Sequence, residues 1–400
     1  MKNFYLSIII LAISAVLFGG CFEEEKIITA DMRGGNIETD SKVDEKNPAR
    51  KETNQNENKK IGGISLNESI DKKLNSMTLE EKIGQMVMVG VYGTELNDDI
   101  IFSMSNYHFG GVIFFDRNLE SVAQAKKLAN DIEAIANQKV PMFFAIDEEG
   151  GIIVRGQEFL KPAPSQENIG LDGDPSAATY WAKHNATILK SINCNLNFAP
   201  VADVGSRDTR SFGDDAQFVA EYVDAAANGY EEENFLYTLK HFPGIGKSKI
   251  DPHQEISSVE DSREILDVED LPPFKKIIRE HDNSKFMVMI GHLRYDALDP
   301  MNPASLSYTV VTKLLRNELG FNGVVITDDL EMGAIKNNVD LSTIGVKMIL
   351  AGGDIALVCH DYASQQIVYN SILNAVKRGE ISEERINESV RRILKMKANL

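Results

Sequence analysis

One stretch of this 400-residue chain, "KHFPGIGKSKIDPHQEI" at residues 240–256, holds a Lys-His pair, three turn-forming residues and then Asp251 two positions before His253. The spacing of Asp251 and His253 predicts a loop that brings a carboxylate against an imidazole. Such a contact fixes the tautomer of the ring and raises its basicity, as a general acid/base requires. A polar surface loop is the other interpretation, and this stretch alone favours it.

Further residues that could do chemistry come directly after apolar runs, where buried strands are expected to end. They are Asp147 with Arg155, Asp203 with Arg210, Lys240 with His241, His292, and Asp328 with Asp329. A solvated face is one explanation, because strand ends are polar in most proteins. Ordinary loops would more often begin with Gly, Ser or Asn, so the pattern favours a functional rim.

Asp328 and Asp329 are adjacent carboxylates at the end of one apolar run. Because side chains alternate in direction along a strand, we expect only one of them to point into the site and the other to turn outward. An inward carboxylate that faces a histidine held by an aspartate supplies a nucleophile and an acid/base, the pair that a retaining glycosidase needs. The acid/base is usually a second carboxylic acid, but an imidazole exchanges its proton near neutral pH and can replace it.

Eight short apolar runs alternate with segments of helical periodicity, and these are the elements that must position the polar residues. The runs start at Gln85, Gly110, Pro141, Leu196, Tyr237, Phe286, Gly323 and Asp354, and the helical segments cover residues 121–138, 176–192, 216–233, 263–280, 309–319, 340–351, 363–378 and 381–400. This alternation indicates a parallel sheet covered on both faces, and eight units favour a single (β/α)8 TIM-type barrel of the α/β class. "TLEE" at residues 78–81 predicts a capping box that begins a further helix.

The N-terminal residues 1–21 carry Lys2, an apolar run and then Gly19-Gly20-Cys21, the pattern of a bacterial lipoprotein signal peptide in which Cys21 is lipidated. An ordinary signal peptide that contains a cysteine by chance is the alternative. Residues 22–64 are polar and almost free of aromatic residues, so we expect a disordered tether. Residues 65–400 form the predicted barrel. These features predict a cell-envelope protein, lipid-anchored to a membrane and facing outward from the cytoplasm.

The composition excludes several classes of partner. The net charge of −18 argues against nucleic acid as a partner and says little about a neutral ligand.

Cys194 and Cys359 lie inside apolar runs, so we expect buried thiols and no disulfide. The seven histidines are scattered, without the spacing of a helical zinc site, and we expect no metal or other cofactor. His108, His184, His281 and His360 are assigned to structure or surface, and His292 stays open.

Four motifs together resemble glycoside hydrolase family 3, in its bacterial β-N-acetylglucosaminidase (β-N-acetylhexosaminidase) branch. They are "IDEEGGIIVR", "NFAPVADV…RSFGDD", "KHFPGIGKSKIDPH" and "GFNGVVITDDLEMGAI", and the resemblance runs from about Thr78 to the C-terminus. It implies that Asp328 is the nucleophile, His253 the general acid/base and Asp251 its orienting partner. It also implies a sugar-binding set of Asp147, Arg155, Arg210, Lys240 and His241, whose donors and acceptors suit hydroxyl groups.

The sequence departs from the family pattern at three positions. The family usually has Gly-His-Gly and Asp-Ser-His in the strand-five loop, where this chain has Ile245 and Pro252 in the middle positions. Ile152 stands where a second arginine is usual after the paired glycines. Ile245 removes a polar group and Pro252 fixes its own φ, but no predicted catalytic group is lost. The chain ends after the eighth unit, which fits the branch that keeps its acid/base on the strand-five loop.

The resemblance implies a retaining exo-β-N-acetylglucosaminidase that hydrolyses terminal β-linked N-acetylglucosamine, in peptidoglycan-type or related glycans, through a covalent glycosyl-enzyme. Two alternatives stay open. A neutral imidazole repels phosphate less than a carboxylate does, so a phosphorylase that releases a sugar 1-phosphate is conceivable. The second alternative is a sugar-binding surface lipoprotein that has lost catalysis. Ile245 and Pro252 would then be the first substitutions that accompany this loss.

Overall fold

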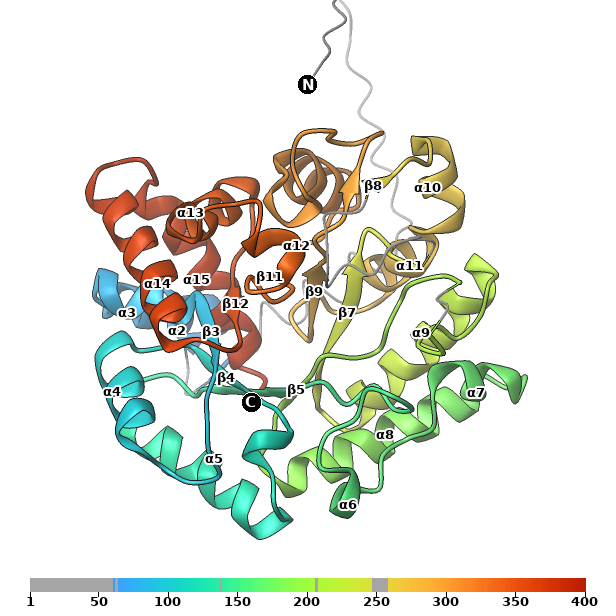
Figure 1. Ribbon diagram of the computed structural model, residues 1–400, viewed down its shortest axis with the longest axis horizontal. Helices are drawn as coiled ribbons and strands as arrows, with labels where there is room; N and C mark the ends of the chain where they lie inside the picture. The colour runs from blue at the N-terminus through green and yellow to red at the C-terminus, as the bar shows by residue number, and fades with distance from the viewer. Residues whose placement is uncertain (1–59, 62–63, 137–138, 206–207, 247–257) are drawn as a thin grey trace, which may run out of the picture. The chain divides into compact units, whose positions relative to one another are not determined.

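The computed structural model describes residues 60–61, 64–136, 139–205, 208–246 and 258–400. Its main feature is one sheet of eight parallel strands in the order β11-β9-β7-β6-β5-β4-β3-β12 (Figure 1). The strands are β3 (Val87–Gly90), β4 (Gly111–Phe114), β5 (Phe143–Ile146), β6 (Leu196–Asn197), β7 (Leu236–Phe242), β9 (Phe286–Ile290), β11 (Val324–Thr327) and β12 (Ala356–Val358). Each strand overlaps one of the eight apolar runs, so all eight predicted strands are confirmed.

The sheet closes on itself between its first and last strands. Ile326, the last residue but one of β11, forms a parallel bridge with Ile355, the residue before β12. The N–H of Thr327 donates to the carbonyl oxygen of Ile355 at 3.1 Å, and the N–H of Leu330 donates to that of Leu357 at 2.9 Å. Strand β12 pairs with β3 on its other side. The predicted (β/α)8 barrel is therefore confirmed.

The strands are buried on both faces, which explains why their sequences are continuously apolar. Every residue of β3, β4, β5, β7, β9 and β11 is buried. Helices cover the outer face of a parallel barrel and side chains fill its interior, so no strand face is left for polar residues. Lys240 and His241, near the C-terminal end of β7, break this rule. Their burial marks that end of the barrel as the place to look for a site.

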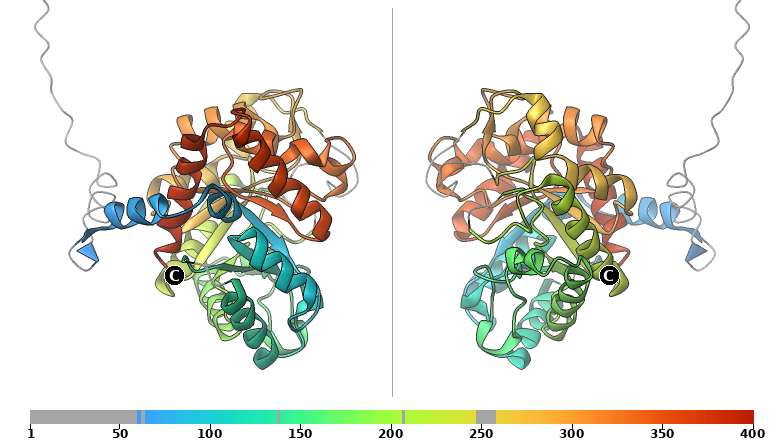
Figure 2. Two further views of the ribbon diagram at one scale, coloured as in Figure 1. Left: turned by 90° about the vertical axis from the view of Figure 1, so that its left-hand side faces the viewer. Right: turned by 90° about the vertical axis from the view of Figure 1, so that its right-hand side faces the viewer.

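Helices surround the sheet on its outer side (Figure 2). They are α2 (Leu66–Asn75), α3 (Leu79–Gln85), α4 (Asp98–Tyr107), α5 (Val122–Ala136), α8 (Ser176–Ser191), α9 (Ala216–Glu232), α10 (Arg263–Glu269), α11 (Pro272–Glu280), η3 (Thr309–Glu318), α13 (Leu341–Ala351), α14 (Tyr362–Lys377) and α15 (Glu383–Lys397). One helix predicted over residues 263–280 is two helices, because Pro272 lacks an N–H and begins α11. The capping box at the start of α3 is confirmed, with Thr78 and Glu81 each accepting the other's backbone N–H.

Shorter elements lie between these units. They are β1 (Lys60–Ile61), β2 (Ile64–Ser65), η1 (Asp116–Asn118), α6 (Gln157–Leu160), α7 (Gln166–Leu171), β8 (Ser258–Val259), β10 (Arg294–Tyr295), η2 (Ala304–Leu306) and α12 (Gly333–Lys336). The parallel pair of β8 and β10 joins the segments that follow β7 and β9. Among the helices of the described residues, none has both the length and the apolar character needed to cross a membrane.

The C-terminal helix α15 closes the N-terminal end of the barrel. Its buried Lys397 donates from Nζ to Gln85 Oε1 and to the carbonyl oxygen of Gly110, both at 2.7 Å. The same nitrogen lies 4.7 Å from the ring centre of Phe143. These three residues precede or begin β3, β4 and β5, so this contact lies at the opposite end of the strands from Lys240.

Candidate active site

A cavity of about 290 Å³ lies at the C-terminal end of the barrel strands. All six sequence-predicted site residues that the structure describes line it: Asp147, Arg155, Arg210, Lys240, His241 and Asp328. They come from the ends of β5, β7 and β11 and from the segments that follow β5 and β6. The fold therefore gathers these side chains at one end of the barrel, as the sequence predicted, and their roles stay predictions.

Lys240 is a buried cation held between two carboxylates. Its Nζ donates to Asp147 Oδ1 at 2.7 Å and lies 2.6 Å from Glu149 Oε1. Burial disfavours the charged amine, but the two carboxylates outweigh burial and raise the pKa of Lys240 above its ordinary value. The side chain is therefore a permanent cation. It has a third N–H that a ligand in the cavity could use.

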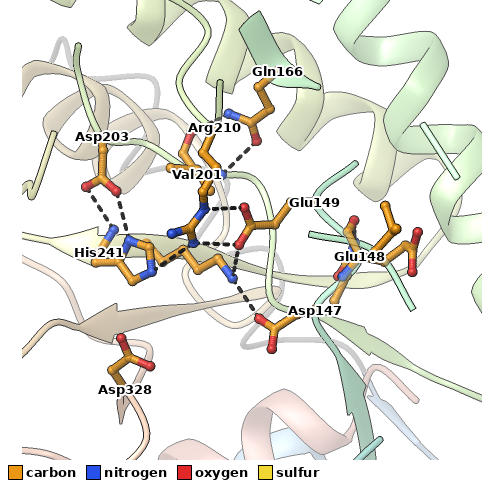
Figure 3. A network of polar contacts seen from close by, with 12 residues as sticks. Asp147, Glu148, Glu149, Gln166, Val201, Asp203, Arg210, His241 and Asp328 are labelled. Atoms are coloured by element: carbon orange, nitrogen blue, oxygen red, sulfur yellow. Dashed lines mark hydrogen bonds and ion pairs between the residues drawn. The ribbon is translucent and has the colours of Figure 1, made fainter. Parts of the chain in front are cut away.

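Arg210 and Glu149 form a two-pronged ion pair beside Lys240 (Figure 3). Arg210 donates from Nε to Glu149 Oε2 and from Nη2 to Oε1, both at 2.8 Å. Burial favours the neutral acid, but Lys240 and Arg210 overcome burial and lower the pKa of Glu149 to about 2. Ser211, the residue after Arg210, stabilises the segment that follows β6, because its hydroxyl group donates to the carbonyl oxygen of Asp203 at 2.7 Å. Glu149 therefore fixes two cations in the cavity.

His241 is held by Asp203, which follows β6. Nδ1 of the ring lies 2.8 Å from Asp203 Oδ2, while Asp203 Oδ1 accepts the backbone N–H of His241 at 3.1 Å and of Ile245 at 2.9 Å. A carboxylate accepts hydrogen bonds, so this contact favours the ring form that donates from Nδ1, and in the neutral ring that form has its lone pair on Nε2. Nε2 lies 3.4 Å from Arg210 Nη2. The Lys240–His241 peptide bond is cis, and both side chains line the cavity.

Asp328 lies directly after β11, half-buried in the cavity wall. Its Oδ1 accepts the backbone N–H of Asp329 at 2.8 Å. Burial opposes ionisation, but His241, His292, the N–H of Asp329 and Lys240 together lower the pKa of Asp328 below its ordinary value. Asp328 is therefore an ionised carboxylate at neutral pH, the state in which a carboxylate acts as a nucleophile.

Asp329 also lines the cavity, so the expectation that it turns outward is wrong. Strand β11 ends at Thr327, and the alternation of side chains along a strand does not extend to the two residues after it. Asp329 Oδ1 accepts the N–H of Cys359 at 3.1 Å, and Oδ2 lies 3.3 Å from His360 Nε2. This carboxylate joins the segments that follow β11 and β12.

Arg155 spans two acidic side chains on another side of the cavity. Its Nη1 lies 3.8 Å from Asp116 Oδ2, and its Nη2 lies 3.8 Å from Asp147 Oδ2. Its backbone N–H donates to Glu148 Oε2 at 2.9 Å. Within the described part of the chain, its Nε is buried without a hydrogen-bond partner. At 3.8 Å the two Nη groups are beyond hydrogen-bond distance of these carboxylates, so the guanidinium group can also donate to a ligand in the cavity.

The structure changes the assignment of one histidine and settles another. His360, assigned to structure or surface, lines the cavity, and its ring centre lies 5.5 Å from that of Phe115. The signal was present, because the eighth apolar run ends in Cys359-His360 as other runs end in site residues. His292 is buried with Nδ1 2.8 Å from Ser305 Oγ and Nε2 3.0 Å from the carbonyl oxygen of Asp329. Burial lowers the pKa of His292 below its ordinary value. The contact of its ring with the carbonyl oxygen of Asp329 supports the segment after β11.

Glu149 was not assigned to the site by sequence, and Asp203 was placed on the functional rim without a role, although both carried a signal. Glu149 stands two residues after Asp147, and Asp203 ends an apolar run. Three residues with predicted functions, Asp251, His253 and Cys21, lie outside the described residues, so their functions stay predictions. Cys194 and Cys359 are buried free thiols, as predicted. Among the described residues, no cluster of His, Cys, Asp and Glu is placed to hold a metal ion.

A family model described as the glycosyl hydrolase family 3 N terminal domain matches residues 78–396 of this chain. The chain belongs to glycosyl hydrolase family 3. This match confirms the resemblance carried by the four motifs, and it covers the barrel from the capping box of α3 to the last turn of α15.

Bacterial relatives extend over most of the barrel. Beta-hexosaminidase A of Pseudoalteromonas piscicida is 31% identical over an alignment of 337 residues, and the match covers 77% of this chain and 56% of that protein. The beta-hexosaminidase of Nitrosomonas eutropha is 32% identical over 299 residues, or 72% and 84% of the two chains. A solved family 3 beta-N-acetylglucosaminidase from Paenibacillus sp. FPU-7 matches with a TM-score of 0.78 at 37% identity, over 81% of this chain and 63% of that one. The chain thus spans little more than half of the first relative's length.

Proposed function

We propose that this protein is a retaining exo-β-N-acetylglucosaminidase, which removes a terminal β-linked N-acetylglucosamine through a covalent glycosyl-enzyme. The observation that carries the proposal is an ionised Asp328 in the wall of a cavity that also presents Lys240, Arg210 and Arg155. The relatives named beta-hexosaminidase and the Paenibacillus beta-N-acetylglucosaminidase support the choice of an N-acetylated sugar.

The cavity suits a single sugar ring. Its volume of about 290 Å³ is at the lower limit for small-molecule pockets, so a longer glycan would place only its terminal unit inside. Lys240, Arg210 and Arg155 offer donors to hydroxyl groups, and Asp147 offers acceptors. Glu149 and Asp203 already hold Arg210 and His241 in place. Binding therefore requires little rearrangement of these side chains, which favours tight and specific recognition.

The proposed reaction has two displacement steps. A carboxylate oxygen of Asp328 bonds to the anomeric carbon as the bond to the glycosidic oxygen breaks, and His253, oriented by Asp251, gives its proton to the leaving oxygen. His253 then takes a proton from water, the water oxygen bonds to the anomeric carbon, and the ester to Asp328 breaks. Two inversions release the sugar with retained β configuration.

Charge in the cavity favours water over phosphate as the acceptor. The described lining holds five carboxylates, Asp147, Glu149, Asp328, Asp329 and Glu331, against three cations, Arg155, Arg210 and Lys240. Phosphate would enter a site with an excess of negative charge, and like charges in a partly dehydrated cavity repel strongly. Hydrolysis therefore ranks above release of a sugar 1-phosphate.

The natural glycan follows from the expected location. A lipid on Cys21 and a tether over residues 22–64 would hold the barrel at the outer side of a bacterial membrane, where peptidoglycan-type glycans with β-linked N-acetylglucosamine occur. Neither the anchor nor this substrate depends on a residue that lines the cavity. The anchor is proposed from the N-terminal sequence, and the peptidoglycan-type substrate is proposed from the location that the anchor would give the protein.

The deciding experiment compares release of 4-nitrophenol from the N-acetyl-β-glucosaminide and from the plain β-glucoside. We expect turnover of the N-acetyl substrate, loss of turnover in Asp328→Asn, and first formation of the β anomer by NMR. Addition of phosphate should leave free N-acetylglucosamine as the product. Formation of the sugar 1-phosphate would show that the protein is a phosphorylase and not a hydrolase. Tight binding of N-acetylglucosamine without turnover would favour a sugar-binding lipoprotein.

A further inference from the structure

The outer surface of the barrel has a second hollow, larger than the cavity at the strand ends. It has a volume of about 610 Å³ and lies between α13 and α14, the helices on the left of Figure 1. One face of α14 supplies Gln366, Ile367, Asn370 and Asn374, and the first turn of α13 supplies Ser342 and Thr343. These six residues are called the α14 groove below.

The α14 groove presents side-chain amides without charge. Gln366, Asn370 and Asn374 follow one another at four-residue spacing, so they form one row along the helix. In the described part of the chain, no hydrogen bond joins any of these three amide groups to another residue. The chain has no charged residue from Ala363 to Val376, although 26% of its residues are charged. Arg378 lines the far end, and its Nε pairs with Glu380 at 2.9 Å.

The row of amide side chains on α14 suits some classes of binding partner better than others. An amide side chain both donates and accepts, and it therefore pairs with hydroxyl groups and with the acetamido group of an N-acetylated sugar. A nucleic acid or an anionic membrane surface would require cations, which this row lacks. A protein partner would require an apolar centre, and Ile367 is the single large apolar side chain of the groove.

The groove also starts close to the rim of the cavity. Helix α14 begins at Tyr362, two residues after His360, which lines the cavity. The hydroxyl group of Tyr362 accepts the backbone N–H of Tyr92 at 3.2 Å, which fixes this end of the helix against the segment after β3. A glycan that occupies the groove is therefore held on the surface of the same rigid barrel that carries the cavity.

We propose that the α14 groove is a second glycan-binding site, which takes an uncharged chain of N-acetylated sugars and holds it beside the catalytic end of the barrel. The choice of an N-acetylated chain rests on the proposed function. The terminal sugar is cleaved in the cavity, while the groove retains the polymer between turnovers. Such retention acts on polymeric glycans and leaves small chromogenic substrates unaffected.

The test measures binding of the full-length protein in detergent to insoluble chitin, a polymer of β-linked N-acetylglucosamine. All proteins carry Asp328→Asn, so that the chitin is bound without being cleaved and any binding through the cavity is the same in every variant. We expect Asn370→Ala with Asn374→Ala to weaken chitin binding about 5- to 20-fold, because two hydrogen-bonding amides are removed. Alanine favours helix, so α14 should fold. The matched control, Gln217→Ala with Asn228→Ala, removes two exposed amides from α9 and should bind as before.

A second readout separates this proposal from the proposed function. With Asp328 restored, both double variants should hydrolyse the 4-nitrophenyl substrate at the rate of the unchanged protein. Equal chitin binding by the groove and control variants would overturn the proposal. A loss of 4-nitrophenyl substrate turnover in the groove variant as large as its loss of chitin binding would also overturn it. Absence of turnover in the unchanged protein would contradict the proposed function alone, since the chitin-binding ratio is measured in an inactive background.

Discussion

At the scale of single residues, His241 depends on Asp203 for its tautomer. In Asp203→Asn the side-chain oxygen can still accept the two backbone N–H groups, but the amide N–H would face the ring N–H at Nδ1. The proton would then move to Nε2, where it would point toward a donor of Arg210. We expect kcat/KM for the small N-acetyl substrate to fall roughly 100-fold with folding retained, because a charge-assisted hydrogen bond becomes a donor-donor contact. Steady-state kinetics and circular dichroism measure the two effects.

A double-mutant cycle shows whether Asp203 acts through His241. If it does, adding Asp203→Asn to His241→Asn should cost little beyond the single His241 change. Fully additive losses would mean that Asp203 supports the site by another route, such as its bond to the N–H of Ile245.

Glu148 provides a prediction about pH. Burial raises its pKa to about 8 from an ordinary value of 4.5, and Oε1 has no partner among the described residues. Between these values the folded protein keeps a proton that the unfolded chain has lost, so the free energy of unfolding falls as pH rises. Glu148→Gln keeps an acceptor for the N–H of Arg155 and cannot ionise. We expect urea denaturation to show nearly equal stability at pH 5 and a gain of about 2–4 kcal/mol in the variant at pH 8. The same gain at both pH values would contradict this account.

The sequence could predict which residues carry the chemistry but not how they pair. Lys240 and Asp147 were predictable because each lies near the C-terminal end of a buried strand of a parallel barrel, where side chains converge. Their direct contact joins positions 93 residues apart, and the Arg210–Glu149 pair joins positions 61 residues apart. Such pairings depend on strand register and on loop paths, which periodicity does not specify. The Asp251–His253 dyad was predicted from local spacing and remains a prediction.

At the scale of elements, strands were easier to predict than the ends of elements. Eight apolar runs predicted eight strands because a parallel strand covered on both faces is mostly apolar, and the few polar residues in these strands, such as Lys240 and His241, did not interrupt the pattern. The break between α10 and α11 was missed, since the apolar spacing continues across it while Pro272 stops the backbone hydrogen bonding. The orientation of Asp329 was missed because the end of β11 decides it, and element ends are the least regular part of the pattern.

The contact of α15 with the base of the barrel can be tested through Lys397. Burial lowers the pKa of Lys397 to about 7, below the ordinary value of 10.5. From pH 7 toward pH 10 the unfolded chain holds a proton that the folded protein has released, so this group makes stability rise with pH. Lys397→Met fills similar space without a charge and should remove about 1–3 kcal/mol of that rise, measured by urea denaturation at pH 7 and pH 9. An unchanged pH dependence would show that Lys397 stays charged when folded. Turnover should be unaffected, since the residue lies at the other end of the strands.

At the scale of the whole molecule, the barrel separates stability from chemistry. The charged residues of the cavity lie at the C-terminal ends of the strands, and the buried Lys397 contact lies at the N-terminal ends. This division is general for the fold, because loops after the strands can vary without disturbing the base. The described lining of the cavity begins in the sequence at Ile113, so an attachment at Cys21 adds no group to that lining.

The proposed lipid anchor is therefore testable independently of activity. We expect Cys21→Ser, expressed in a bacterial host, to move the protein from the detergent phase to the aqueous phase in a Triton X-114 partition. One acyl-modified cysteine supplies the membrane affinity, since each buried methylene contributes about 0.8 kcal/mol. Cys194→Ala is the control: this thiol is buried in the barrel core, and the variant should stay in the detergent phase. Turnover of the 4-nitrophenyl substrate should be the same for the anchored and the released protein, because the small substrate reaches the cavity from solution in both. Aqueous partition of the unchanged protein would contradict the anchor and leave the glycosidase proposal intact.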